Sequence, residues 1–508
     1  MILENGVVRT MDPSLPTTGA LAIAGERVAG GVGTHETALA SPDVVDLGGR
    51  CVIPGLTDSH VHFPSWAVAR RLIRLEEATS AEDAAARMKA GLADLAPGRW
   101  LRAQGFREAD WPAAPTSAAL DAVTGDVPAA LVSKDYHSIW LNSAAIARAG
   151  GDLRAYDVPG GVVEVDGRGE PTGLIREESA WLFKEDHLEY RDDEYLEAMR
   201  DGLKVASSRG ATAIHDKDGW LPSIPRLWQE LERDEVLTVR VWQSIQHDQL
   251  DGIAAAGLAS GLGGDRLRLG YLKVFMDGTL GSRTALMTNG GGVEITSRDE
   301  LADILRRSAR ARWPLAVHAI GDRANRNALD AFEDTRDEWQ PVGLRHRVEH
   351  VQCLRPEDVK RFAELGVTAS VQFSHAPSDE ALAKRFWADR LERAYSFRDL
   401  LAAGARLING SDAPIEELDP WGGLCAGVLE HWRPDQRVTV EEALVASTVA
   451  PAWQTYDERR RGKLLPGYLA DLVVLNRDPL AIPADELPEV EIVATMVGGR
   501  WTHNPPPW

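Results

Sequence analysis

The chain has 508 residues, a formal net charge of −21, a hydrophobic fraction of 44% and a charged fraction of 26%. This length favours two or three domains, or one large barrel with an appended domain, and the composition is ordinary for a globular protein. Because a surface this acidic repels phosphate backbones and anionic lipid, we expect no nucleic-acid partner and no membrane partner. A small-molecule substrate is compatible with the charge, and a homodimer is left open.

Cysteine is scarce, with Cys51, Cys353 and Cys425 only. This count offers no disulfide framework, and the lack of a Cys-x-x-Cys pair excludes a zinc ribbon. The first residues show no basic stretch followed by an apolar run and a cleavage site, and no apolar stretch reaches the ~20 residues that span a bilayer. We therefore expect a cytoplasmic location.

Both ends of the chain have the character of β-sheet. Within residues 1–53, short strand-like runs broken by Gly and Pro lie at 2–9, 19–23, 27–31, 44–47 and 50–53. Within residues 458–508, strands are expected at 462–465, 472–475 and 491–497. We predict that these two terminal segments pair into one composite β-sandwich domain.

Between them, over residues 54–457, apolar strands alternate with amphipathic helical segments. Strands are expected at 131–133, 211–215, 267–276, 315–318, 346–350, 368–372 and 407–409, and helices at 298–311, 356–365 and 397–403. Strands separated by helices indicate a parallel sheet, and about eight such units would close a (β/α)8 TIM barrel, an α/β fold. Residues 63–200 exceed one crossover and predict an insertion over the barrel mouth, with a helix at 79–96 capped by Thr79 or Ser80.

Histidines and an aspartate stand where predicted strands end, which is where a barrel places its chemistry. His60 and His62 are two residues apart on an extended chain, so both imidazoles can reach one ion. His318 and His350 each end an apolar strand, and Asp412 closes the last one. In isolation, such residues are more often core histidines and a turn aspartate. Together, imidazole and carboxylate ligands suit Zn²⁺ or a similar divalent first-row ion.

Lys273 lies inside an otherwise apolar strand, where burying its charge is costly. A cation beside a divalent metal would be repelled, whereas carbamylation by carbon dioxide would turn the lysine into an anionic bridging ligand. His346 precedes His350 by four residues on the same expected strand. We expect it to support the ligands from outside.

Taken in order, the motifs resemble the amidohydrolase superfamily, family 3, in its YtcJ-like and N-substituted formamide deformylase-like branch. The matching segments are 54–62, 100–112, 137–143, 169–173, 273–283, 317–324, 347–350, 410–414 and 467–474. The resemblance implies one metal ion on His60, His62 and Asp412, and a second on His318 and His350 with Lys273 bridging. One or two ions remain open, because members of the superfamily differ. Tyr136 departs from the branch, which usually has Gly there, so the pocket shape cannot be carried over.

The expected reaction is hydrolysis of a non-peptide C–N bond in an amide, formamide or cyclic amide. Metal-activated hydroxide would attack, and Asp412 would carry the proton to the leaving nitrogen. Two alternatives stay open: hydrolysis of an ester, lactone or phosphotriester on the same ligands, and a non-catalytic interaction protein on this barrel.

Further residues are candidates for contacting the substrate. His137 is the candidate for stabilising the oxyanion, against the alternative of a loop histidine. Asp277 and Arg283 could bind substrate or fix the loop after Lys273. The tryptophans of the insertion, among them Trp140, could line an apolar site or form a local core. The substrate-binding candidates are Asp277, Arg283, His215, Tyr136, His375 and Trp140.

Overall fold

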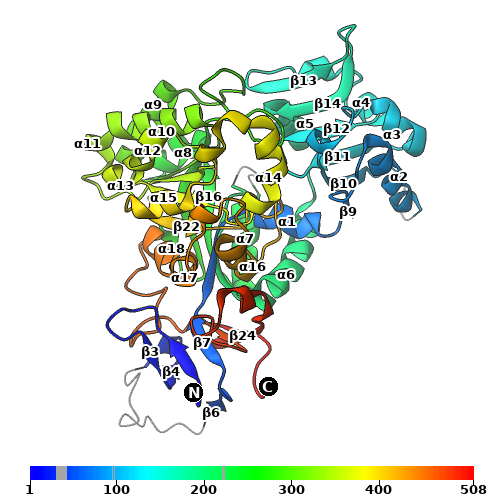
Figure 1. The fold of residues 1–508 in the computed structure, drawn as a ribbon. Coiled ribbons are helices and arrows are strands. Elements are labelled where there is room, and N and C mark those ends of the chain that lie inside the picture. The colour runs from blue at the N-terminus through cyan, green and yellow to red at the C-terminus, as the bar shows by residue number, and fades with distance from the viewer. Residues whose placement is uncertain (30–42, 94, 97, 220–222) are drawn as a thin grey trace.

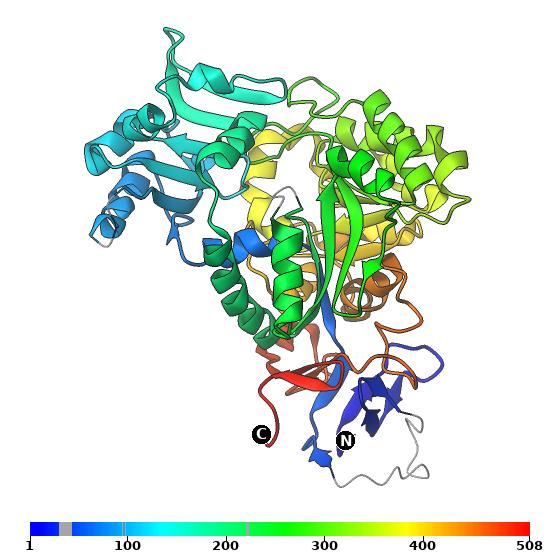
Figure 2. The same cartoon turned by 180° about the vertical axis from the view of Figure 1, so that it is seen from behind.

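Eight parallel strands form the centre of the molecule. The computed structural model describes residues 1–29, 43–93, 95–96, 98–219 and 223–508. The strands follow one another around the sheet in chain order (Figures 1 and 2). They are β8 (Leu56–Val61), β15 (Ala211–Asp216), β16 (Arg240–Gln246), β18 (Leu267–Phe275), β19 (Leu315–Ala319), β20 (Arg347–His350), β21 (Thr368–Val371) and β22 (Leu407–Asn409). The expected α/β class and parallel sheet are confirmed.

The segment after β22 brings the last strand back to the first. Asp412 N donates to His60 O at 2.7 Å, and His62 N donates to Ala413 O at 2.8 Å. Val61 and Ala413 form a parallel bridge. These bonds nearly close the eight-stranded barrel. The closing contact lies between β8, which carries His60, and the segment after β22, which carries Asp412.

Helices cover the outside of the barrel. The expected helix at 298–311 is confirmed as α9 (Arg298–Ala311). It begins with a capping box between Ser297 and Glu300, which satisfies backbone N–H groups at its start. The expected helix at 356–365 is divided at Lys360 into α12 (Pro356–Val359) and α13 (Arg361–Leu365). The helix expected at 397–403 is α15 (Phe397–Ala402).

The assignment of 131–133 to the barrel is wrong. This segment is β11 (Ala129–Ser133), which pairs with strands of the insertion. The third barrel strand is instead β16, which was missed because Arg240, Gln243 and Ser244 interrupt its apolar pattern. All three are buried. Buried polar side chains therefore interrupt the apolar pattern by which a barrel strand is predicted.

The insertion forms a cap with its own sheet, in the order β13-β14-β12-β11-β10-β9. The strands lie within the expected range of 63–200, and α2 (Ala81–Leu92) begins at the N-cap Ser80. Figure 1 shows α5 (Glu178–His187) of the cap and α14 (His375–Phe386) where the cap and barrel meet. The other cap elements are β9 (Ile73–Arg74), β10 (Leu101–Phe106), β12 (Ser138–Leu141), β13 (Gly161–Val165), β14 (Pro171–Glu177), α3 (Ser117–Thr124) and α4 (Ser143–Arg148).

The two chain ends share a six-stranded sheet, where β7 (Cys51–Pro54) pairs antiparallel with β23 (Leu472–Leu475). A four-stranded sheet built from β1 (Ile2–Glu4), β4 (Leu21–Ala24), β5 (Arg27–Val28) and β6 (Val44–Asp46) contributes to the same apolar core. Both views place the N-terminal and C-terminal strands together at one end of the molecule. The domain boundaries stay a prediction.

Several details of these sheets differ from expectation. The strand expected at 2–9 is divided into β1 and β2 (Val7–Arg9), and 462–465 is not a strand. β24 (Ile492–Val497) matches the expected 491–497, and β25 (Arg500–His503) was not foreseen. Of the strand expected at 27–31, residues 30 and 31 lie outside the described residues. Among the described residues, no helix combines the length and apolarity needed to cross a bilayer.

Candidate metal centre

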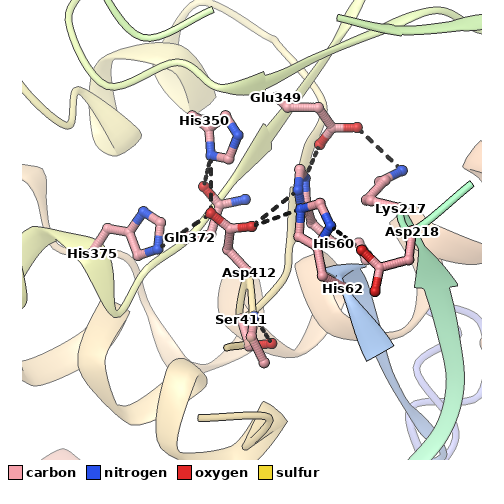
Figure 3. Close-up of polar contacts among 12 residues, drawn as sticks. His60, His62, Lys217, Asp218, Glu349, His350, Gln372, His375, Ser411 and Asp412 are labelled. Atoms are coloured by element: carbon pink, nitrogen blue, oxygen red, sulfur yellow. Dashed lines mark hydrogen bonds and ion pairs between the residues drawn. The ribbon is translucent and has the colours of Figure 1, made fainter. Parts of the chain in front are cut away.

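The two histidines of β8 are each held by a carboxylate. His60 Nδ1 lies 2.7 Å from Glu349 Oε2, and His62 Nδ1 lies 2.7 Å from Asp218 Oδ1 (Figure 3). A carboxylate at Nδ1 keeps the proton there and leaves the Nε2 lone pair available. The two Nε2 atoms lie 3.2 and 3.6 Å from Asp412 Oδ1. Both imidazoles therefore present their free nitrogen to one carboxylate oxygen.

The second oxygen of Asp412 meets another pair of histidines. His350 Nδ1 lies 3.6 Å and His375 Nε2 3.8 Å from Asp412 Oδ2. His350 Nδ1 also lies 2.9 Å from Gln372 Oε1, and Gln352 Nε2 lies 3.1 Å from His375 Nδ1. Asp412 therefore stands between two histidine pairs, as Figure 3 shows.

These residues fit a divalent ion. Within each triad, one donor atom per residue lies within 4.8 Å of the others; the triads are His60, His62 and Asp412, and His350, His375 and Asp412. The Nε2 atoms of His60 and His375 are buried and have no hydrogen-bond partner among the residues that the structure describes. Buried nitrogens without partners are costly unless something binds them. Imidazole nitrogens with a carboxylate oxygen form a donor set that Zn²⁺ accepts.

Burial sets the protonation of the centre. It lowers the pKa of His60 and of His350 well below the ordinary value, which favours the neutral form that ligates metals. Burial also raises the pKa of Asp412 well above its usual range. For Glu349, burial alone would raise the pKa, but Arg347 and His60 hold it well below the usual range. The centre thus combines neutral imidazoles with an ionised supporting carboxylate.

The backbone at two of these positions is unusual. Asp412 has φ of 58° and His350 has φ of 73°. Residues with a Cβ rarely occupy this left-handed region, and they do so most often where function over-determines the conformation. The strain coincides with the two strand ends that place Asp412 and His350 in the cluster.

His318 and Lys273 lie beside the cluster. The ring of His318 is 4.5 Å from that of His350 between centroids, but its Nε2 lies 3.2 Å from Gly278 O. His375 rather than His318 completes the triad with His350. Lys273 Nζ is buried, has no hydrogen-bond partner among the described residues and lies 4.6 Å from the Phe275 ring centroid. Metal ligation by His318, and bridging and carbamylation by Lys273, stay predictions.

Sequence reasoning missed the charged groups that support the histidines. Glu349 Oε1 lies 2.8 Å from Arg347 Nε and 3.3 Å from Lys217 Nζ, and all three residues are fully buried. Asp218, which supports His62, was also missed. The available signal was charge inside barrel strands and at their ends, in Asp216-Lys217-Asp218 and Arg347-Val-Glu349.

A cavity of about 370 Å³ lies between the barrel and the cap. Its barrel side includes His62, His350 and Asp412. Its cap side includes the predicted residues Tyr136 and His137. His375 and Trp181 line it as well, together with Lys273, Phe275 and His318. The predicted metal ligands other than His60 therefore face the same space as the predicted oxyanion residue His137.

Four substrate-binding candidates lie outside this lining. Asp277 accepts hydrogen bonds from three backbone N–H groups, and the ring of His215 is buried with Nδ1 3.1 Å from Arg347 Nη1. Trp140 donates to Thr116 O and is fully buried in the cap core. Arg283 is exposed on the loop after β18. Asp277, His215 and Trp140 are thus committed to the protein interior.

The role expected for His346 is also wrong. Its Nδ1 accepts a hydrogen bond from Leu315 N at 2.9 Å, and its ring packs against Phe332 and Trp339. Residues four apart on an extended strand are separated by about 13 Å. His346 therefore lies at the other end of β20 from His350 and supports the helix packing instead.

The fold and the cluster define a barrel with histidine and aspartate donors gathered at the carboxyl ends of its strands. The sequence model described as the amidohydrolase family matches residues 43–503. The chain therefore belongs to the amidohydrolase family, and the resemblance to its YtcJ-like branch is confirmed.

Relatives match over nearly the whole chain. YtcJ of Bacillus subtilis, whose name assigns it to the amidohydrolases, is 29% identical over 94% of this chain and 92% of its own. An N-substituted formamide deformylase of Arthrobacter pascens is 26% identical over 98% of this chain and 97% of its own. The crystal structure of an uncharacterized metal-dependent hydrolase from Pyrococcus horikoshii superimposes with a TM-score of 0.77 at 27% identity, covering 95% of this chain and 99% of that one.

Proposed function

We propose that this protein is a metal-dependent hydrolase that cleaves a non-peptide C–N bond of a small molecule in the cytoplasm. The observation that carries the proposal is the position of Asp412, whose two oxygens face two separate histidine pairs at the cavity wall. The deformylase and the metal-dependent hydrolase among its relatives support the reaction class.

His60, His62 and Asp412 would hold one divalent ion, for which Zn²⁺ fits the donors. His350 and His375, sharing Asp412, would hold a second. A bound ion supplies Lewis acidity and lowers the pKa of water from ~15.7 to roughly 7. Asp412, whose oxygens face the histidine pairs at the cavity wall, would accept a proton from water and return it to a leaving nitrogen.

His137 would stabilise negative charge on the substrate oxygen. Burial alone would lower its pKa, but the Glu177 carboxylate at 2.6 Å from Nδ1 raises it above the ordinary value. An imidazolium at the cavity wall can donate a hydrogen bond to a developing oxyanion. Half-buried Trp181 and Phe275, 5.0 Å apart between ring centroids, offer apolar contact to an organic substrate.

Hydrolysis of an ester, lactone or phosphotriester is the second candidate, because the same ligands serve these substrates. A non-catalytic role is disfavoured because both triads are complete. The test is a metal analysis of the purified protein, followed by a screen of N-formyl, N-acyl and ester substrates with and without chelator. Hydrolysis of N-acyl or N-formyl compounds that is lost with chelator and regained with Zn²⁺ supports the proposal. Turnover of esters alone would overturn the C–N assignment.

A further inference from the structure

The loop that follows β18, residues 277–284, is fixed to the barrel at its first residue. The Asp277 carboxylate accepts hydrogen bonds from the backbone N–H groups of Leu286, Ile320 and Gly321, at 2.8, 3.0 and 2.8 Å. Asp277 is fully buried, so these bonds satisfy a group that would otherwise be costly. The loop therefore leaves the barrel in a defined direction.

Three hydroxyl groups of this loop contact two carboxylates of the cap. Thr279 Oγ1 and Ser282 Oγ donate to Asp135 Oδ2 at 2.6 and 2.7 Å. Thr284 Oγ1 donates to Glu177 Oε1 in a short hydrogen bond. Hydrogen bonds to charged acceptors are stronger than neutral ones, so these contacts join the cap to the barrel firmly.

Each of the two carboxylates uses its other oxygen to hold His137. Asp135 Oδ1 accepts the His137 backbone N–H at 3.2 Å, and Glu177 Oε2 lies 2.6 Å from His137 Nδ1. Glu177 N also donates to His137 O at 2.8 Å. The His137 ring then lies 5.6 Å from that of His318 between centroids. A cap residue is thus brought beside the barrel histidines through the loop.

Two glycines make the close approach feasible. A Cβ at Gly278 would lie 2.4 Å from Glu177 Oε1, and a Cβ at Gly281 would lie 2.7 Å from Asp135 Oδ2. Real Cβ atoms essentially never come this near an oxygen. A side chain at either glycine would therefore displace the cap carboxylate that contacts it.

We propose that residues 277–284 form a docking loop, and that Asp135 and Glu177 are positioning residues that place His137 against the metal centre. This inference rests on the proposed function for the role of His137, but the docking itself can be tested without a substrate. It gives a role to the motif around Asp277, whose side chains were candidates for binding substrate. Instead, the hydroxyl groups of this loop hold the cap in position through hydrogen bonds to Asp135 and Glu177.

The first experiment compares Thr284→Val with Thr284→Ser in the metal-reconstituted full-length protein. Valine removes the donor to Glu177, whereas serine keeps it. Amide hydrogen exchange of the segment 137–141 should become roughly tenfold faster in Thr284→Val, as expected for losing a hydrogen bond to a charged group, and stay unchanged in Thr284→Ser. Thr335→Val, a buried threonine that donates to Ala331 O, controls for general loss of a hydroxyl. Equal exchange in all variants, or faster exchange in the control as well, would overturn the docking.

The second experiment compares Gly281→Ala with Gly252→Ala. Nothing lies within 4 Å of a Cβ at Gly252, and neither glycine has a positive φ, so the pair isolates the close contact with Asp135. With a substrate from the screen, Gly281→Ala should lower kcat/KM by roughly 10- to 100-fold, since small displacements of catalytic groups are costly. Its metal content should stay at the wild-type level. Loss of metal, or unchanged kinetics together with unchanged exchange of 137–141, would contradict the proposal. If no substrate is found, the proposed function fails while exchange still decides the docking.

Discussion

The two halves of the histidine cluster are held by different kinds of side chain. His60 and His62 have carboxylates at Nδ1, both at 2.7 Å. His350 and His375 have the amides of Gln372 and Gln352, at 2.9 and 3.1 Å. A carboxylate partner increases the basicity of an imidazole and orients it, and such partners affect metal affinity strongly. The β8 half should therefore bind its ion more tightly than the other half.

This stronger support has a structural requirement. The Glu349 carboxylate is fully buried, and it is balanced by Arg347 and Lys217. A buried carboxylate without such partners would take up a proton instead of remaining charged. Gln372 is neutral and needs no such counter-charge. The histidines of β8 therefore depend on a buried charge network, whereas His350 and His375 are held by neutral amides.

The largest effect is expected from Asp412, which both halves share. Asp412→Asn removes the proton carrier and one charged donor from each triad, and should lower kcat by roughly 10²- to 10⁴-fold. Turnover of a substrate from the screen, metal content and circular dichroism measure activity, binding and fold separately. A folded variant with rates near those of the wild type would refute the assignment of Asp412.

A smaller effect is expected when the carboxylate support alone is changed. Glu349→Gln keeps the shape but weakens the contact to His60 Nδ1, and should reduce affinity for the tighter ion by about 10- to 100-fold. Gln372→Glu is the reciprocal change, but among the described residues its carboxyl has no counter-charge such as Arg347 or Lys217, so it should stay protonated and leave affinity at the other half nearly unchanged. Competitive titration of the apoprotein with a chromogenic chelator measures both. An equal loss of metal affinity at both halves in Glu349→Gln would show that the two halves do not differ in this way.

Metal removal should also separate the halves. Imidazoles held by amides are weaker donors than imidazoles held by carboxylates. Dialysis against increasing chelator should therefore release the ion at His350 and His375 first, at a chelator concentration about tenfold lower than the other ion needs. Metal content measured at each step should pass through a plateau near one ion per chain. Release of both ions in a single step would indicate equivalent positions.

The smallest effect on the metal centre is expected from Asp471, which links the terminal sheet to β16. Burial alone would raise its pKa, but Arg240, which it contacts at 2.7 and 2.8 Å, holds the pKa at about 2. The pKa of Asp471 in the folded protein lies below the ordinary 3.8. Its contribution to the free energy of unfolding is therefore full above pH 3.8 and is lost as pH falls toward about 2. That contribution is about 2 kcal/mol.

Asp471→Asn should therefore lower the free energy of unfolding at neutral pH and flatten its dependence on pH below about 4. Chemical denaturation across that range measures both quantities. Metal content at neutral pH serves as the internal comparison and should match the wild type. A change in metal affinity as large as that of Glu349→Gln would show that Asp471 acts on the cluster as well.

The sequence predicted part of the cluster well and part of it poorly. The spacing of His60 and His62 and the strand-end position of Asp412 were sufficient, because β8 and the segment after β22 are local features of the chain. The partnership of His350 with His375 was not foreseen, because His375 begins helix α14 rather than ending a strand. Strand β16 was missed because its buried polar residues hide its apolar pattern.

The alternation of strands and helices and the residue types at the strand ends can be read from the chain without a structure. Periodicity and spacing are properties of the chain alone, and they were enough to indicate a parallel barrel with metal-binding donors. Which side chains contact one another depends on the packing of the whole fold. Glu349 reaches His60 across 289 positions and Thr284 reaches Glu177 across 107, because barrel closure and cap docking bring these segments together. No local pattern encodes such contacts, since they depend on how whole elements pack.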